Sequence, residues 1–177
     1  KDIRTTDIIN NIDDNVDIIE SGNKITIKKA LMKADIITLS TGLNEILYKL
    51  ENEQSEDYVM YEYVDELMQD IKKLLIIIRR YCKEDIIVLG YYNPFINKVL
   101  KNEEKVDNII KYANLKLLEI TKEEDAYYVD LYTLLKNNRK VFTSVSSYYP
   151  NIEGYKLISK QIIDLIEEKI VSASKTI

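Results

Sequence analysis

Three short apolar runs, separated by long segments of helical periodicity, constrain the fold of this chain more than any other feature of its sequence. The runs cover residues 35–40, 85–90 and 126–131, and each is rich in β-branched or aromatic residues. Such runs, apolar on both faces, are typical of strands in a parallel sheet that helices cover on both sides. The alternation of strand and helix therefore predicts an α/β domain with a doubly wound, mostly parallel sheet.

Segments with a 3.6-residue spacing of apolar residues lie between and around these strands. The expected helices cover 6–12, 27–34, 64–82, 106–120 and 158–166. The last of them begins after Asn151, which is a suitable N-cap, and a polar turn is expected at 21–23. No linker, internal repeat or low-complexity tract interrupts the pattern, so residues 1–177 are expected to form a single domain.

The first strand, Asp35 to Ser40, raises the question of what pairs with it on its free side. A strand that is apolar on both faces suits a central position better than an exposed edge. The chain before Asp35 offers no convincing strand, because 25–27 is too short and helix-forming residues follow it. We therefore expect an N-terminally incomplete domain, with one or two strands upstream of Lys1, or a protein partner that supplies them.

The charge pattern excludes several classes of partner. The net charge is −5 and lysines are interleaved with acidic residues, so we expect no nucleic-acid partner. No run approaches the about 18 apolar residues that a membrane span requires.

Cys82 is the only cysteine, which excludes an internal disulfide and favours a buried structural thiol. The chain has no histidine, its acidic residues are scattered, and it has no glycine-rich phosphate loop, so we expect no metal and no cofactor.

Ligands of parallel sheets bind at the carboxyl ends of the strands, where this sequence places several polar residues. Gly42 and Asn44 follow the first strand. A glycine lets the backbone approach a substrate closely, and a side-chain amide can donate to a developing oxyanion. Asn44 could instead cap a helix over 45–50, and the tripeptide alone favours this capping role. The other strand-end candidates are Tyr91, Tyr92, Asn93, Tyr148 and Tyr149. They either line a pocket or pack in the core, and for the tyrosines packing is favoured.

Two segments resemble conserved blocks of the SGNH (GDSL-type) hydrolases, a family of serine esterases and lipases. The first is 34–45, an apolar strand with Gly42-Leu43-Asn44 and the acid Glu45, and the second is 146–155. Shorter similarities at 4–9 and 86–94 extend the resemblance over nearly the whole chain. The resemblance implies a flavodoxin-like sheet, an oxyanion donor at Asn44 and a Gly-Asp-Ser nucleophile upstream of Lys1. It also implies a bacterial protein that is secreted or surface-anchored, while the sequence itself leaves a cytoplasmic location open.

The second block departs from the family pattern at the positions of the catalytic acid and base. The family pattern is Asp-x-x-His-Pro-Asn, but here Ser146 stands in the Asp position and Tyr149 in the His position. An imidazole with a pKa of about 6.5 can accept a serine proton near neutral pH, whereas a phenol with a pKa of about 10 cannot. A neutral serine cannot orient the base or stabilise its cation. The usual triad is therefore absent from this chain.

Three functions remain open. The leading prediction is a catalytically degenerate esterase- or lipase-like domain that acts as a binding or structural domain, with a small acyl or ester ligand. The alternative is an active carboxylic-ester hydrolase whose nucleophile lies upstream and whose base is unusual. The third is a domain that is completed by strands from a partner chain.

Overall fold

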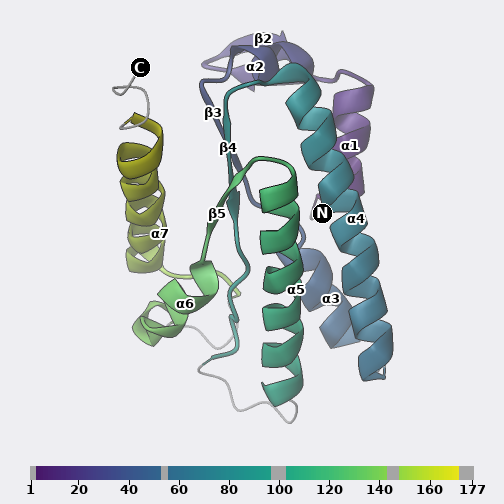
Figure 1. Ribbon diagram of the computed structural model, residues 1–177, viewed down its shortest axis with the longest axis vertical. Helices are drawn as coiled ribbons and strands as arrows, with labels where there is room; N and C mark the ends of the chain where they lie inside the picture. Colours follow the sequence, from purple (N-terminus) through teal and green to yellow (C-terminus); the bar gives the residue numbers. More distant parts are fainter. Residues whose placement is uncertain (1–2, 53–55, 97–102, 143–147, 172–177) are drawn as a thin grey trace.

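The computed structural model describes residues 3–52, 56–96, 103–142 and 148–171 (Figure 1). Three parallel strands form the central sheet in the order β3-β4-β5. Their bounds are Ile36–Leu39 for β3, Asp85–Leu89 for β4 and Tyr127–Val129 for β5. Each strand lies inside one of the three apolar runs, so the predicted α/β fold with a parallel sheet is confirmed.

The central strand, β4, is buried on both faces because its side chains alternate between two hydrophobic cores. Ile86 and Val88 belong to the larger core, and Ile87 belongs to the smaller one. A strand with two apolar faces therefore lies between two helical layers, as its unbroken apolar sequence requires.

Helices cover both faces of the sheet (Figure 1). The larger core lies under α1, α3, α4 and α5, and the smaller core lies under α6 and α7. The bounds are Thr5–Asp13 for α1, Ile27–Lys33 for α2, Leu43–Asn52 for α3, Asp57–Tyr81 for α4, Glu103–Glu123 for α5, Leu131–Lys136 for α6 and Ile152–Leu165 for α7. A short 3₁₀ helix, η1 (Arg139–Val141), follows α6, and a π-helical turn, η2 (Ile166–Val171), extends α7. None of the described helices is long and apolar enough to cross a bilayer.

The N-terminal region contains a β-hairpin, which corrects the prediction that no strand precedes Asp35. β1 (Asp17–Glu20) pairs antiparallel with β2 (Asn23–Thr26) and forms a separate two-stranded sheet. The two turn residues, Ser21 and Gly22, have φ values of 49° and 81°, as a tight hairpin turn requires. Both strands are largely exposed and lack the alternation of apolar and polar residues that marks a half-buried strand, so the sequence pattern did not reveal them.

Within the described residues the central sheet has two edge strands, β3 and β5, each of which pairs only with β4, and the β3 edge is the one for which the sequence predicts a neighbour. Thr38 is exposed, Ile36 and Ile37 are half-buried, and Leu39 is buried. The hairpin does not fill this edge. The expectation of a further strand or a partner beside β3 remains a prediction.

Candidate active site at the carboxyl ends of the strands

The segment after β3 makes a turn that only glycine fits well. Gly42 has a φ of 92°, a left-handed conformation that side chains rarely adopt. A Cβ at this position would lie 2.6 Å from the hydroxyl oxygen of Tyr91 and 3.1 Å from the Cδ1 of Ile71. The turn directs the chain into α3, which begins at Leu43. Asn44 therefore lies within the first helical turn and does not occupy the N-cap position that the tripeptide favoured.

The structure brings together the two halves of the resemblance to the hydrolase family. The side-chain amide of Asn44 donates to the hydroxyl of Tyr149 at 3.5 Å, although 105 positions separate the two residues in sequence. This distance is at the long limit of a hydrogen bond, so the contact is weak. Asn44 is half-buried and Tyr149 is 51% exposed. The predicted oxyanion donor thus lies beside the phenol of Tyr149, the residue that the sequence resemblance aligns with the family's histidine.

Tyr92, in the loop after β4, lies near Tyr149 and Tyr155. Burial raises the pKa of Tyr92 well above its ordinary value, and the nearby Tyr155 and Tyr149 raise it further. The ring of Tyr92 packs against Phe142 with 5.6 Å between ring centroids. Tyr92 therefore remains a neutral phenol at physiological pH, able to donate a hydrogen bond or pack against an apolar group. It does not supply a base.

Tyr148 turns toward the C-terminal end of α3. Its hydroxyl donates to the carboxylate of Glu51, and this hydrogen bond, with burial and the negative charge, raises the pKa of Tyr148 to about 12. Its ring meets Phe95 edge-on with 5.5 Å between centroids. These contacts hold Tyr148 in place beside its chain neighbour Tyr149. Ser146, the predicted replacement for the catalytic acid, lies outside the described residues.

The other two strand-end candidates lie in the interior rather than in a pocket wall. Tyr91 is 2% exposed, and its hydroxyl is buried without a hydrogen-bond partner among the described residues. The buried amide of Asn114 holds the backbone of Tyr91 by accepting from its N–H at 2.7 Å and donating to its carbonyl at 2.9 Å. Asn93 is 5% exposed, and its side-chain oxygen accepts from the backbone N–H of Phe95 at 2.9 Å. Both residues shape the loop after β4.

The acid of the first block has a structural contact. Glu45 accepts from the backbone N–H of Thr5 at 2.8 Å and from the Thr5 hydroxyl at 2.7 Å. Thr5 is fully buried, and its hydroxyl also lies 2.9 Å from that of Thr41. A carboxylate at a helix start is stabilised by the first N–H groups of the helix, which have no partner within the helix. Glu45 therefore fixes the start of α1 against α3, next to Asn44.

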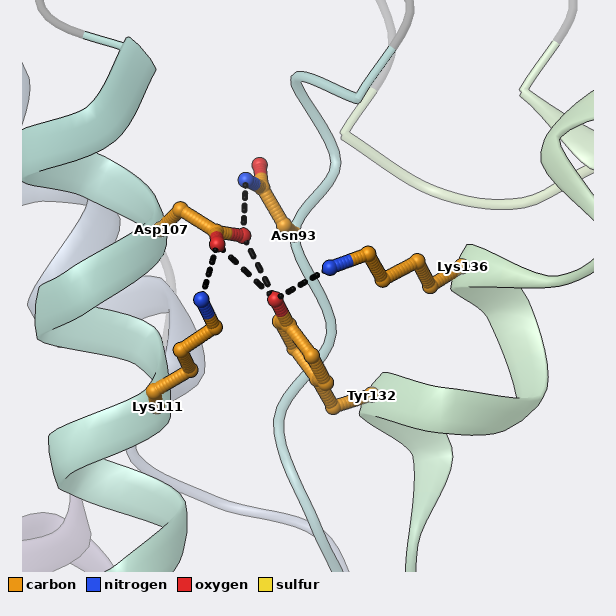
Figure 2. Close-up of polar contacts among 5 residues, drawn as sticks. All are labelled: Asn93, Asp107, Lys111, Tyr132 and Lys136. Atoms are coloured by element: carbon orange, nitrogen blue, oxygen red, sulfur yellow. Dashed lines mark hydrogen bonds and ion pairs between the residues drawn. The ribbon is translucent and has the colours of Figure 1, made fainter.

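A second polar cluster, which sequence reasoning missed, joins three elements at the same end of the sheet (Figure 2). The carboxylate of Asp107 on α5 accepts from the Tyr132 hydroxyl at 2.8 Å, from Lys111 at 2.8 Å and from the Asn93 amide at 3.3 Å. Lys136 in turn donates to the Tyr132 hydroxyl at 3.1 Å. Two pairs with helical i, i+4 spacing, Asp107 with Lys111 and Tyr132 with Lys136, were the available sequence signals.

Hydrogen bonding decides the charge state of this cluster. Partial burial opposes ionisation of Asp107, but the hydrogen bonds from Lys111, Tyr132 and Asn93 outweigh it and hold the pKa of the carboxyl below its ordinary value. The hydrogen bond to Asp107 and its negative charge raise the pKa of Lys111. Asp107 is thus a fixed anion whose donors come from its own helix, the β4 loop and α6. The arrangement connects these three elements.

The part of the chain that the structure describes contains no group of three or more acidic or cysteine side chains placed to hold a metal ion. The chemistry available around Asn44 is accordingly that of amide and phenol donors beside apolar surface. Amide and phenol groups of this kind can hydrogen-bond to a carbonyl or ester oxygen.

Comparison with known proteins gives the class of the fold. No protein-family model matches the sequence. The chain is 24% identical over 147 residues to the spore germination lipase LipC of Bacillus licheniformis, which corresponds to 79% of this chain and 67% of that lipase.

Solved structures agree with this similarity. The lipase Lip_vut3 from a goat rumen metagenome superposes with a TM-score of 0.73 at 22% identity, covering 92% of this chain and 73% of that one. A variant of the acetyl-xylooligosaccharide esterase Axe2 from Geobacillus stearothermophilus gives 0.66 at 13% identity, covering 94% and 69%. A GDSL-like lipase from Parabacteroides merdae has the same architecture. The chain therefore has the fold of the SGNH (GDSL-type) lipases and esterases, as the two sequence blocks predicted.

Proposed function

We propose that this chain is an SGNH-type, esterase-like domain without a working catalytic triad, which binds a small acyl or ester ligand. The observation that carries the proposal is Tyr149. It stands in the position of the family's histidine, and its hydroxyl lies 3.5 Å from the amide of Asn44. The chain contains no histidine that could replace it.

The chemistry of the phenol supports binding over catalysis. A general base works best when its pKa lies near the working pH, and a phenol at about 10 is protonated at neutral pH. A protonated phenol is instead a hydrogen-bond donor, like the amide of Asn44. The Asn44 amide and the Tyr149 hydroxyl lie 3.5 Å apart, so together they suit the carbonyl oxygen of an ester, with the half-exposed ring of Tyr149 and the ring of Tyr92 beside its apolar part.

Hydrolysis and binding must be measured separately to test this proposal. We expect the protein not to hydrolyse 4-nitrophenyl butyrate above the buffer rate, and to bind methyl octanoate in a saturation-transfer NMR experiment. Asn44→Ala should weaken that binding about tenfold, since a hydrogen bond in a partly buried site contributes about 1 kcal/mol or slightly more. Asn52→Ala, on an exposed turn of the same helix, is the matched control. Turnover of the nitrophenyl ester that depends on an upstream Gly-Asp-Ser serine would instead establish the alternative, an active carboxylic-ester hydrolase with an unusual base.

A restoration experiment distinguishes a lost base from a lost fold. The double variant Ser146→Asp/Tyr149→His returns the family pattern to its acid and base positions. In a protein that also carries a Gly-Asp-Ser serine, we expect this variant to gain esterase activity over the parent. A correctly folded double variant with no gain would show that the tyrosine is not what prevents catalysis.

Two surface features favour the further proposal that another strand and helix complete the domain. β3 has an open edge within the described residues, and α7 presents a stripe of exposed apolar side chains, Ile152, Tyr155 and Ile163, which are 72%, 49% and 52% exposed. A sheet edge and an apolar helix face are the two surfaces that a strand–helix unit would cover. The unit would come from a longer form of the protein or from a partner chain.

A further inference from the structure

A groove of about 890 Å³ lies between the segment 136–141 and the first turns of α7, outside the site around Asn44 and Tyr149. Its volume falls in the range of about 300–1,000 Å³ that small-molecule sites occupy. Buried Val141 and half-buried Leu157 contribute its apolar lining. The remaining lining residues are polar or charged: Lys136, Asn137, Asn138, Arg139, Lys140, Glu153, Lys156 and Lys160.

The groove is cationic in a chain that is acidic overall. Five of its lining residues are Lys or Arg and one is Glu, whereas the whole chain has 25 basic and 30 acidic residues. Lys136 directs its ammonium group to the hydroxyl of Tyr132 (Figure 2), so its charge is already engaged. Lys156 pairs with Glu153 at 2.7 Å, but both side chains are about two-thirds exposed, and such a pair contributes little. Arg139, Lys140, Lys156 and Lys160 carry the other positive charges of the groove.

The fold brings these four cations together from two separate segments. Lys156 and Lys160 lie one helical turn apart on α7, and Arg139 and Lys140 lie on η1. The backbone N–H of Asn151 donates to the carbonyl of Val141 at 2.8 Å and so joins η1 to the start of α7.

Gly154 allows the close approach of these two segments. A Cβ there would lie 2.4 Å from the Cβ of Pro150 and 3.0 Å from that of Val141. The first N–H groups of α7, those of Glu153 and Gly154, are capped by the side chain of Asn151. Backbone contacts thus hold together the two segments that carry the charges.

We propose that this groove binds a ligand carrying two or more adjacent phosphate groups. Like charges gathered at this density repel one another, and a multivalent anion offsets that repulsion while it bridges η1 and α7. The guanidinium of Arg139 matches the oxygen pairs of a phosphate, and the lysines add point charges around it. None of Gly42, Asn44, Tyr92 or Tyr149 lines the groove, so the proposal stands independently of the ester ligand.

The test is isothermal titration calorimetry of the intact chain with inorganic triphosphate at low ionic strength. Lys140→Glu/Lys160→Glu should weaken binding at least about tenfold, because each charge-assisted hydrogen bond contributes about 1.5–3 kcal/mol. The control is Lys29→Glu/Lys33→Glu on α2, which changes the net charge equally at two exposed lysines outside the groove. The affinity of the parent should fall as salt is added.

Co-sedimentation with phosphatidylcholine vesicles that contain phosphatidylinositol 4,5-bisphosphate, against vesicles of phosphatidylcholine alone, identifies the source of the phosphates. Binding of triphosphate alone assigns the groove to a soluble phosphorylated ligand. Binding of both triphosphate and the anionic vesicles, lost in the groove variant, assigns it to a lipid headgroup. Absence of triphosphate binding, equal losses in the groove and control variants, or groove-dependent binding of an oligonucleotide without triphosphate binding would each overturn the proposal.

Discussion

Gly42 shows how a single residue sets the geometry of the candidate site. Its left-handed φ starts the turn that leads to Asn44, and its missing side chain leaves the space that the Tyr91 hydroxyl occupies. Two separate costs would therefore follow from any side chain at this position. One is the strain of a positive φ, and the other is the collision with Tyr91 and Ile71.

Gly42→Ala and Gly22→Ala separate these two costs. Gly22 has a similar φ of 81°, but a Cβ there would meet nothing within 4 Å. We expect Gly22→Ala to lower the free energy of unfolding by about 1 kcal/mol, from backbone strain alone, and Gly42→Ala to lower it by about 2–4 kcal/mol. Urea unfolding monitored by circular dichroism measures both. Equal losses in the two variants would mean that Tyr91 does not press against Gly42.

The buried hydroxyl of Tyr91 gives a second prediction at this scale. A buried polar group without a hydrogen-bond partner costs free energy that a hydrocarbon of the same shape does not. We expect Tyr91→Phe to stabilise the protein by about 1 kcal/mol, with no change in methyl octanoate binding. Tyr128→Phe is the matched comparison, because its hydroxyl donates to Asn114 at 2.9 Å and its loss should destabilise. A destabilised Tyr91→Phe would show that the Tyr91 hydroxyl has a partner in solution.

At the scale of elements, α5, α6 and the β4 loop are joined through one carboxylate. Asp107 receives hydrogen bonds from all three, and its pKa lies below the ordinary value because the ionised form is the one that is bonded. A carboxyl with a depressed folded-state pKa stabilises the protein above the unfolded pKa. That stabilisation is lost as the pH falls through the folded pKa.

Asp107→Asn should therefore show a pH-dependent cost. Between pH 5 and 7, above the ordinary carboxyl pKa of about 4, we expect the variant to be less stable by about 1 kcal/mol. The difference should shrink as the pH falls below about 4, because the parent then becomes protonated and loses the same interaction. Thermal unfolding at several pH values measures it. A difference that stays constant down to pH 3 would contradict the charged state of Asp107.

The sequence predicted some elements and residues of this site and missed others for physical reasons. The three strands were predictable because strands buried on both faces are continuous apolar runs. The hairpin was not, because β1 and β2 are exposed and carry no such signal. The juxtaposition of Asn44 and Tyr149 follows from the rule that parallel strands present their carboxyl ends together. The burial of Tyr91 agrees with the packing role that the sequence favoured for the strand-end tyrosines. The burial of Asn93 could not be predicted, since a residue just after a strand can turn toward either layer.

At the scale of the whole molecule, two uncovered features distinguish the surface: a free strand edge and an apolar helix face. The open edge of β3 and the apolar stripe of α7, formed by Ile152, Tyr155 and Ile163, both lack a covering element within the described residues. An exposed strand edge is a template for pairing with another chain. If the domain needs a further strand and helix, the chain alone should associate through these surfaces.

We expect the isolated chain to self-associate in a concentration-dependent manner, and Thr38→Lys/Ile163→Lys to reduce the association strongly. A lysine on a strand edge opposes pairing with another strand, and one on α7 interrupts its apolar stripe. Sedimentation velocity over a range of concentrations measures the effect, with Thr133→Lys on the exposed side of α6 as the control. A parent chain that stays monomeric at high concentration would contradict the proposal that the domain needs completion.

The sheet also divides the molecule into two hydrophobic cores of unequal size, the larger under α1, α3, α4 and α5 and the smaller under α6 and α7. The thinner layer should open more often, so that amide protons of α7 exchange with solvent through partial unfolding that leaves α4 and α5 protected. Asn44 lies on α3, in the layer whose amide protons we expect to exchange slowly. Tyr149 lies just before α7, in the layer whose amide protons we expect to exchange rapidly. Their meeting point is thus a boundary between two cooperative units, and a ligand bound across it would slow the exchange of α7 without altering that of α4.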